Sequence, residues 1–175
     1  MERPDAAVRD AQGSGTAAPE ERQPHVVAAG AVGAHDIEQG REEELIHPPP
    51  NCHKFIACVD GRPVGFVQIL DPAHDSEYWG ESPHPAGSLR AIDIWIGEPD
   101  ALGRGYGTAM MRQALERCFA QREVMAVLAD PLASNTRACR FYARLGFELI
   151  ERRWFREGDC CVYRLDRPQR RPDSP

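Results

Sequence analysis

Apolar and polar positions form short runs over the middle of the chain, and this pattern predicts β-strands. The apolar runs 55–59 and 64–70 flank Asp60-Gly61. Asp-Gly between two such runs is the strongest short-range signal for a β-hairpin. A third apolar run covers 89–97. We therefore predict a hairpin followed by a separate strand.

The pattern changes to helical spacing after the third strand. Apolar residues recur every three or four positions over 105–121, which predicts a helix. The apolar run 124–130 then predicts a strand that ends on an acid. Because a strand, a helix and a strand in this order form a right-handed crossover, 89–97 and 124–130 should lie parallel and adjacent.

The last part of the domain continues with a helix and two strands. A second helical pattern opens on Ser134 or Asn135, which are common helix caps, and closes at Gly146. Two final strands are predicted at 147–155 and 160–165. The expected fold class is α/β (α+β), with a mixed, mostly antiparallel sheet, a central parallel strand pair and flanking helices.

The two ends of the chain differ from this central part in composition. Residues 1–24 are rich in Ala, Gly, Pro and charge, so we expect a disordered tail. Residues 167–175 have the same character and are expected to be flexible. The remaining 25–166 suit one domain, in which 36–46 are expected to form a short acidic helix.

Charge separates into an acidic and a basic region. The net charge of −6 argues against a nucleic-acid-binding protein. Residues 71–100 hold seven acids and one base, whereas 101–175 hold nine acids and fourteen arginines. Two ligands of opposite sign would explain this pattern, and chance variation on a solvated surface is the alternative. The acidic region includes a long loop, 71–88, of the kind that often carries function.

Metal, redox and membrane signals are weak in this sequence. The six cysteines form no C-x-x-C pair, and the six histidines show no metal-ligand spacing. We expect a reduced, cytoplasmic protein without a metal, as a monomer or homodimer. The small-residue run 26–34 is too short to span a membrane and lacks the basic start of a signal peptide.

Three alternating glycines, Gly103, Gly105 and Gly107, connect the third strand to its helix. Glycine permits backbone angles that turn successive N–H groups toward one point, and a helix N-terminus favours an anion. Arg104 adds a positive charge. The stretch is neither a G-x-x-x-x-G-K-[ST] loop nor a G-x-G-x-x-G dinucleotide motif. The glycines alone leave two interpretations, a phosphate-binding loop and a flexible turn.

Three stretches in order resemble the GNAT superfamily of acetyl-CoA-dependent N-acetyltransferases. They are "AIDIWIGEPD", "LGRGYGTAMMRQAL" and "LADPLASNTRACRFYARLGFE". The signature N-x-x-A-x-x-F-Y-x-x-x-G-F is intact from Asn135 to Phe147, whereas Leu102 replaces the usual Gln or Arg of the pyrophosphate loop. The resemblance covers about 55–165. Within the superfamily, these stretches and the Tyr-Trp pair of the acidic loop look most like the aminoglycoside 6′-N-acetyltransferases.

The resemblance implies transfer of an acetyl group from acetyl-CoA to a primary amine of a cationic small molecule. An aminoglycoside-like acceptor, modified at its 6′-amine in antibiotic resistance, is the first expectation. Related branches acylate siderophore hydroxylamines, which is one alternative. The first strand and helix of the family have no recognisable counterpart in 1–24, so a non-catalytic acyl-CoA-binding paralogue is another. We expect the protein to bind neither nucleic acid nor a membrane.

The resemblance also implies roles for single residues. Asp93 would lie at the acceptor amine as a base or amine ligand, and Tyr142 would protonate the leaving thiolate. Asp130 would contact the cationic acceptor, and Asn135 the pantetheine arm. The corresponding structural interpretations are a solvent-facing strand acid, a core tyrosine, a turn-forming Asp-Pro and a helix cap.

Two further sets complete the candidate site. The acceptor set combines aromatic faces with acids, which suits a polycation, although the aromatics could instead close over the core. Its members are Tyr78, Trp79, Glu81, Asp93 and Asp130. The expected acetyl-CoA contacts are Ile94, Trp95, Ile96, Gly103, Arg104, Gly105, Tyr106, Gly107, Thr108, Asn135 and Ala138.

Overall fold

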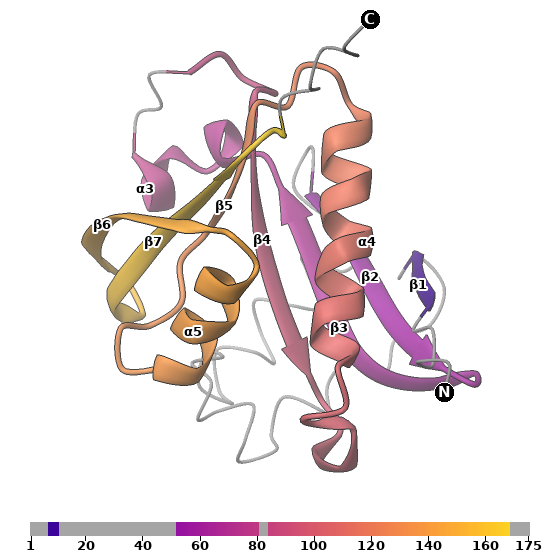
Figure 1. Cartoon of the computed structure of the whole chain (residues 1–175). Coiled ribbons are helices and arrows are strands. Elements are labelled where there is room, and N and C mark those ends of the chain that lie inside the picture. Colours follow the sequence, from indigo (N-terminus) through magenta and orange to yellow (C-terminus); the bar gives the residue numbers. More distant parts are fainter. Residues whose placement is uncertain (1–6, 11–51, 81–83, 169–175) are drawn as a thin grey trace, which may run out of the picture.

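A seven-stranded sheet forms the centre of the computed structural model, which describes residues 7–10, 52–80 and 84–168 (Figure 1). The strands are β1 (Ala7–Asp10), β2 (Cys52–Val59), β3 (Arg62–Leu70), β4 (Leu89–Ile96), β5 (Ala126–Ala129), β6 (Glu148–Phe155) and β7 (Gly158–Asp166). Their order across the sheet is β1-β2-β3-β4-β5-β7-β6. The predicted mixed α/β class is confirmed.

The predicted hairpin is the pair β2–β3. Asp60 and Gly61 form its turn with φ angles of 52° and 82°, the left-handed region that a two-residue hairpin turn requires. Val59 pairs with Arg62, and the ladder continues to Cys52 opposite Leu70. The sequence thus identifies this turn because Asp and Gly tolerate a conformation that most residues avoid.

Strands β4 and β5 form the predicted parallel pair, joined by helix α4 (Tyr106–Ala120). Their pairing is short, from Leu89 opposite Ala126 to Ala91 opposite Leu128. Strand β4 continues to Ile96 along β3, whereas β5 ends at Ala129. The two strands therefore separate beyond Ala91 (Figure 1).

The main core lies between the sheet and the helices α4 and α5 (Thr136–Arg144). Met110, Met111 and Cys118 of α4 are buried there against Ile92 and Val127. Alternate strand residues, Leu89, Ala91, Ala126 and Leu128, form a second cluster with Leu70 and Trp79. Because successive side chains of a strand point to opposite faces, this second cluster covers the other side of the sheet.

Three expectations about the chain are wrong in part. Four residues of the expected disordered tail form β1, which pairs with β2 from Ala7–Cys58 to Asp10–Phe55. The loop 71–88 contains two short helices, η2 (Pro72–His74) and α3 (Ser76–Trp79). The interpretation as a plain loop missed them because they hold no apolar period and are set by aspartate caps.

The C-terminal boundary also needs correction. Arg167, which we assigned to the flexible tail, donates hydrogen bonds to the carbonyls of Val124, Phe119 and Gln121. It therefore belongs to the folded domain. The expected helix at 36–46 lies outside the described residues. Among the helices that the structure describes, none is long and apolar enough to cross a membrane.

Candidate active site

Two carboxylates lie where β4 and β5 separate. Ala91 is opposite Leu128 in the parallel pair, and Asp93 and Asp130 each follow two residues later. A strand returns to the same face every two residues, so both acids project on the side of the second core cluster. Asp93 is exposed and Asp130 is half-buried. The separation of the strands thus opens a site with two acids at its edge.

The hydroxyl of Tyr142 lies within electrostatic reach of both acids. Tyr142 is buried in α5, with its ring against Phe147 at 5.4 Å and Tyr163 at 6.0 Å between centroids. Burial, and then the charges of Asp93 and Asp130, raise the pKa of its phenol. The group therefore stays protonated at neutral pH, as a proton donor must. The charges of Asp93 and Asp130 thus act on the phenol of Tyr142, and the chemical roles of the three residues stay predictions.

Helix α5 begins as its sequence predicts. The Oδ1 atom of Asn135 accepts a hydrogen bond from the amide of Ala138 at 3.1 Å, so Asn135 is the N-cap. Its structural interpretation is confirmed, and its contact with a pantetheine arm stays a prediction. Ala138 is half-buried against the main core.

The glycine loop ends in an exposed helix N-terminus. Gly103 and Gly105 have φ angles of 74° and 89°, and a Cβ on either would meet no atom within 4 Å. Gly105 is the N-cap of α4, and its carbonyl accepts from the amides of Thr108 and Ala109 at 3.1 Å. The amides that precede Thr108 have no acceptor within the helix. They form the donor set that an anion such as a pyrophosphate needs.

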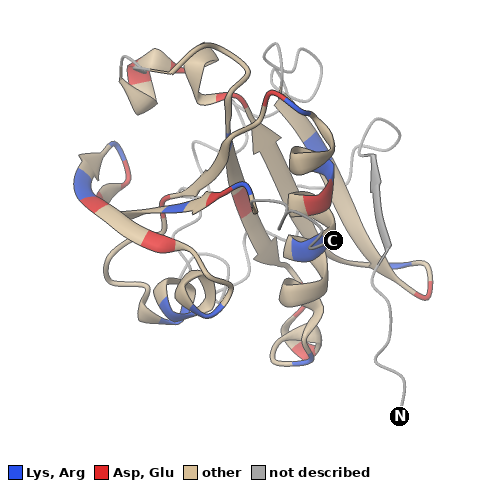
Figure 2. Ribbon diagram, turned by 45° about the horizontal axis from the view of Figure 1, so that its top comes forward, with Lys and Arg blue, Asp and Glu red and all other residues tan. Residues whose placement is uncertain are grey.

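Helix α5 lies beside this N-terminus. A Cβ at Gly107 would stand 3.7 Å from the ring of Phe141 and 3.8 Å from Ile96. The only charged residues of α5 are basic and exposed, Arg137, Arg140 and Arg144 (Figure 2). An anion at the start of α4 would thus lie near positive charge, as the basic C-terminal half of the chain suggested.

Four of the expected cofactor contacts have side chains that pack within the protein. Tyr106 is buried in the main cluster, so only its backbone amide is available to a ligand. Trp95 stacks on Phe66 with ring centroids 4.3 Å apart. Ile94 and Ile96 pack against the main core as well. On β4, the backbone beyond Ala91 rather than the side chains is placed for the expected contacts.

The aromatic pair of α3 divides between two roles. Tyr78 donates a hydrogen bond to the Oδ2 atom of Asp130 at 2.7 Å and stacks on Phe155 at 4.4 Å. Trp79 instead packs into the second core cluster, and its carbonyl accepts from Arg153 at 2.6 Å. The structure therefore places Tyr78 at the acids and Trp79 in the wall behind them. Glu81 lies outside the described residues.

Glu157 is a site residue that the sequence did not reveal. It lies in the turn between β6 and β7, where an acid usually faces solvent. After burial, the negative charge of Glu157 adds to the causes that raise the pKa of Asp130 and of Tyr78. The signal for it is topological, because β7 is the neighbour of β5 and brings the hairpin turn toward Asp130.

The environment of Asp130 disfavours its ionised form. Burial is the main cause that raises its pKa, and the charge of Glu157 adds to it. The hydrogen bond from Tyr78 and the charge of Arg153 act in the opposite direction. A site of this kind gains most from a cation, which would restore the favourable environment of the ionised carboxylate.

The Asp130→Asn variant is expected to raise the free energy of unfolding by about 1 kcal/mol at neutral pH. The unfolded carboxyl ionises near its ordinary pKa of 3.8 and the folded one at a higher pH. The ionised carboxylate of Asp130 therefore lowers the free energy of unfolding at pH values above both the unfolded and the folded pKa. At pH values below both, the carboxyl is protonated in each state and the effect disappears. Thermal unfolding at several pH values should show the difference at pH 7 and its loss toward pH 3.8.

The matched control is Asp166→Asn, an exposed acid paired with Arg164 at 2.8 Å. Surface pairs contribute little, so we expect a change within about 0.5 kcal/mol. A destabilised Asp130→Asn protein at pH 7 would contradict the account of Asp130, because it would mean that the ionised side chain supports the fold.

Comparison with known proteins begins with the family. The family described as "Acetyltransferase (GNAT) domain" matches residues 21–155. The chain is 35% identical over 94 residues to the aminoglycoside N(6′)-acetyltransferase type 1 of Klebsiella pneumoniae, across 54% of this chain and 46% of that protein. It is 38% identical over 71 residues to a kanamycin resistance protein of Rhizobium radiobacter, across 41% and 64%. The chain spans about half the length of the first of these relatives.

Solved structures share the fold. The aminoglycoside acetyltransferase AAC(6′)-Ib in complex with coenzyme A superimposes with a TM-score of 0.80 at 24% identity, over 93% of this chain and 95% of that one. Its complex with paromomycin and acetyl-CoA gives 0.81 at 22% identity, over 97% and 99%. The family match covers well over half of the residues, so the chain belongs to the GNAT acetyltransferase family.

Proposed function

We propose that this protein transfers an acetyl group from acetyl-CoA to a primary amine of a cationic, aminoglycoside-like small molecule. The observation that carries the proposal is the position of Asp93 and Asp130, both two residues beyond the last parallel pair of β4 and β5, together with the effect of their charges on the phenol of Tyr142. Such a site combines two groups that hold and deprotonate an ammonium with one that donates a proton. Membership of the GNAT family supports the reaction type.

The acceptor side is acidic and aromatic. Asp93, Asp130 and Glu157 supply negative charge, and Tyr78 supplies a ring and a hydroxyl beside them. Several acids around one opening favour a ligand with several positive charges over a neutral hydroxylamine. The printed names of the relatives, an aminoglycoside N(6′)-acetyltransferase and a kanamycin resistance protein, support an aminoglycoside amine, with the 6′-amine as the expected position.

The donor side fits coenzyme A. The amides at the start of α4 suit a pyrophosphate, and the open space over Gly103 and Gly105 leaves room for one. Parallel pairing of β4 with β5 ends at Ala91, and the β4 backbone beyond it is placed to meet the amide-containing pantetheine arm. Acetyl-CoA supplies the activated acetyl thioester, and structural neighbours hold coenzyme A or acetyl-CoA.

The residues of this chain then divide the chemistry. Asp93 and Asp130 hold the acceptor as an ammonium, and Asp93 takes its proton, directly or through water. Backbone N–H groups of residues 94–96 donate to the thioester carbonyl oxygen, where negative charge develops. Tyr142 gives its proton to the departing thiolate. Holding both reactants at the strand separation removes much of the entropic barrier.

The test is release of coenzyme A thiol from acetyl-CoA with a panel of acceptors. We expect release with kanamycin-like aminoglycosides and none above background with an aminoglycoside that has a hydroxyl in place of the 6′-amine. Stabilisation of the protein by coenzyme A without thiol release for any amine would contradict the proposal and favour a non-catalytic binder. Preference for longer acyl chains and N-hydroxy acceptors would favour the siderophore alternative instead.

A further inference from the structure

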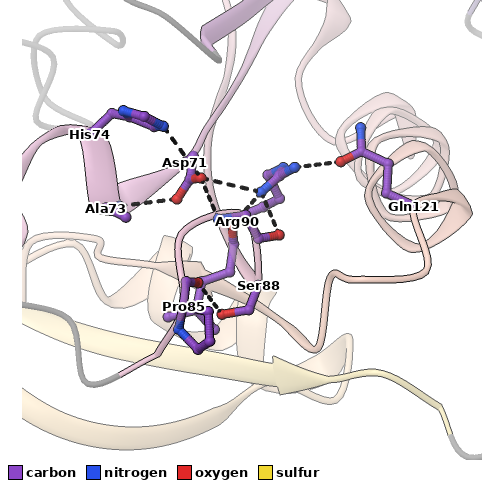
Figure 3. Close-up of polar contacts among 9 residues, drawn as sticks. Asp71, Ala73, His74, Pro85, Ser88, Arg90 and Gln121 are labelled. Carbon is purple, nitrogen blue, oxygen red and sulfur yellow. Dashed lines mark hydrogen bonds and ion pairs between the residues drawn. The ribbon is translucent and has the colours of Figure 1, made fainter.

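Asp71, at the end of β3, is a buried carboxylate with several partners. Its side chain is 3% exposed. It accepts hydrogen bonds from the amides of Ala73 at 3.0 Å and Gly87 at 2.7 Å, and lies 3.8 Å from Arg90 Nη1 and from His74 Nε2 (Figure 3). Ala73 and Gly87 stand near the two ends of the segment 71–88. One side chain therefore closes this segment into a loop.

Arg90, the second residue of β4, completes the closure. Its Nη1 atom donates to the carbonyls of Gly87 at 3.0 Å and Leu89 at 2.7 Å, and its Nη2 atom donates to the side chain of Gln121 at the end of α4 (Figure 3). We refer to Asp71 and Arg90 together as the clasp. The clasp ties both ends of the segment to the sheet and to α4.

A continuous series of hydrogen bonds runs from the clasp to the acids of the site. The carbonyl of Asp71 accepts from His74 at 3.0 Å, and that of Pro72 from Asp75 at 3.2 Å. The side chain of Asp75 then caps α3 by accepting from the amide of Tyr78 at 3.3 Å. Tyr78 donates to Asp130 at 2.7 Å. The turns 71–74 and 72–75 overlap, and the cap of α3 begins at Asp75, where the second turn ends, so consecutive backbone turns connect Asp71 to Tyr78.

Stability alone does not explain a buried ion pair at this place. Strands β3 and β4 are already joined by their own ladder, up to Leu70 opposite Ala91. Apolar residues can replace a buried ion pair without loss of stability in many proteins, because desolvation offsets the attraction between the charges. The carboxylate of Asp71 accepts hydrogen bonds from the amides of Ala73 and Gly87 and so fixes the path of the backbone at both positions. An apolar side chain at position 71 could not do this.

We infer that Asp71 and Arg90 are positioning residues of the acceptor site, which hold α3 so that Tyr78 meets Asp130. The inference rests on the proposed function for the identity of the acceptor site. The other contacts of α3, such as the bond from Arg153 to the Trp79 carbonyl, limit the displacement when the clasp is lost. The effect is therefore on acceptor binding and not on the fold as a whole.

The first experiment measures steady-state kinetics of Asp71→Ala with the aminoglycoside acceptor and acetyl-CoA. We expect the acceptor KM to rise about tenfold while kcat and the Kd for coenzyme A change less than about twofold. Asp71→Asn keeps one acceptor oxygen, so its acceptor KM should lie between those of the wild type and Asp71→Ala. This variant is used for the test if Asp71→Ala does not fold. In a Tyr78→Phe background, where the bond to Asp130 is already absent, the Asp71 substitution should raise the acceptor KM by a smaller factor.

The second experiment is independent of turnover. Amide hydrogen exchange of residues 75–79 should become about tenfold faster in Asp71→Ala, with exchange in α4 unchanged. Arg167→Met is the matched control, because the Arg167 side chain also donates to backbone carbonyls near the end of α4, whereas none of its hydrogen bonds reaches the described part of 71–88. It should lower thermal stability without a change in acceptor KM or in exchange at 75–79.

The outcomes separate the two proposals. Equal acceptor KM and equal exchange at 75–79 in Asp71→Ala and the wild type would overturn the inference, as would an equal loss of acceptor and coenzyme A binding. If the wild-type protein acetylates no amine, the proposed function fails, and the exchange experiment still decides whether the clasp positions α3.

Discussion

The Asp93→Asn variant is expected to lose acetyl transfer by a factor of about 10² to 10⁴ while it binds coenzyme A as the wild type does. Asp93 lies on β4 two residues beyond the last parallel pair, where β5 no longer covers the strand edge. Asparagine has the same shape but can neither take a proton nor neutralise an ammonium. Steady-state kcat/KM for the amine measures the loss of transfer, and the calorimetric Kd for coenzyme A measures whether cofactor binding is retained.

Asp60→Asn provides the matched control for this substitution. Asp60 lies in the turn of the β2–β3 hairpin at a φ of 52°, a conformation that asparagine also tolerates. Its kinetics should equal those of the wild type. Unchanged turnover in Asp93→Asn would show that Asp93 is an ordinary strand acid. Loss of coenzyme A binding together with transfer would show that it supports the donor side.

Local signals in the sequence predicted most of the fold. The hairpin follows from Asp60-Gly61, and α4 lies within one residue of its expected start at 105 and end at 121. These features depend on neighbours along the chain, since a turn needs particular φ angles and a helix needs an apolar face with a period of 3.6. The parallel pair followed from the crossover rule, which is also a statement about consecutive elements.

Elements that depend on partners distant in the sequence were not predicted. Strand β1 has no apolar alternation and is formed by its pairing with β2, whose residues lie some fifty positions away. Helix α3 depends on the cap of Asp75 and on contacts with Phe155 and Asp130. No property of residues 71–88 alone distinguishes such a segment from an open loop.

The candidate site shows the same division. The resemblance to the family pointed to Asp93 and Tyr142, and in the structure the charge of Asp93 acts on the phenol of Tyr142. The sequence did not show which residues contribute a side chain and which only a backbone amide, so the burial of Tyr106 in the core was not expected. Glu157 was missed because its role depends on the neighbouring positions of β5 and β7 in the sheet.

The Tyr142→Phe variant is expected to reduce kcat about a hundredfold with little change in the acceptor KM. The substitution removes one hydroxyl and keeps the ring that packs on Phe147 and Tyr163, so the fold should remain intact. The loss appears in kcat because the proton is needed only when the thiolate departs. Single-turnover rates and thermal unfolding of the variant measure the two expectations.

The pH dependence distinguishes a proton donor from a packing residue at position 142. Burial and the charges of Asp93 and Asp130 raise the pKa of this phenol above its ordinary value of 10.0. A donor is active in its protonated form, so the activity that depends on it persists below the raised pKa and is lost only above it. The wild-type kcat should therefore show no fall assignable to Tyr142 below pH 10.0. Equal kcat values in Tyr142→Phe and the wild type over this range would mean that the tyrosine serves the core alone, and the thiolate would then leave without a protein acid.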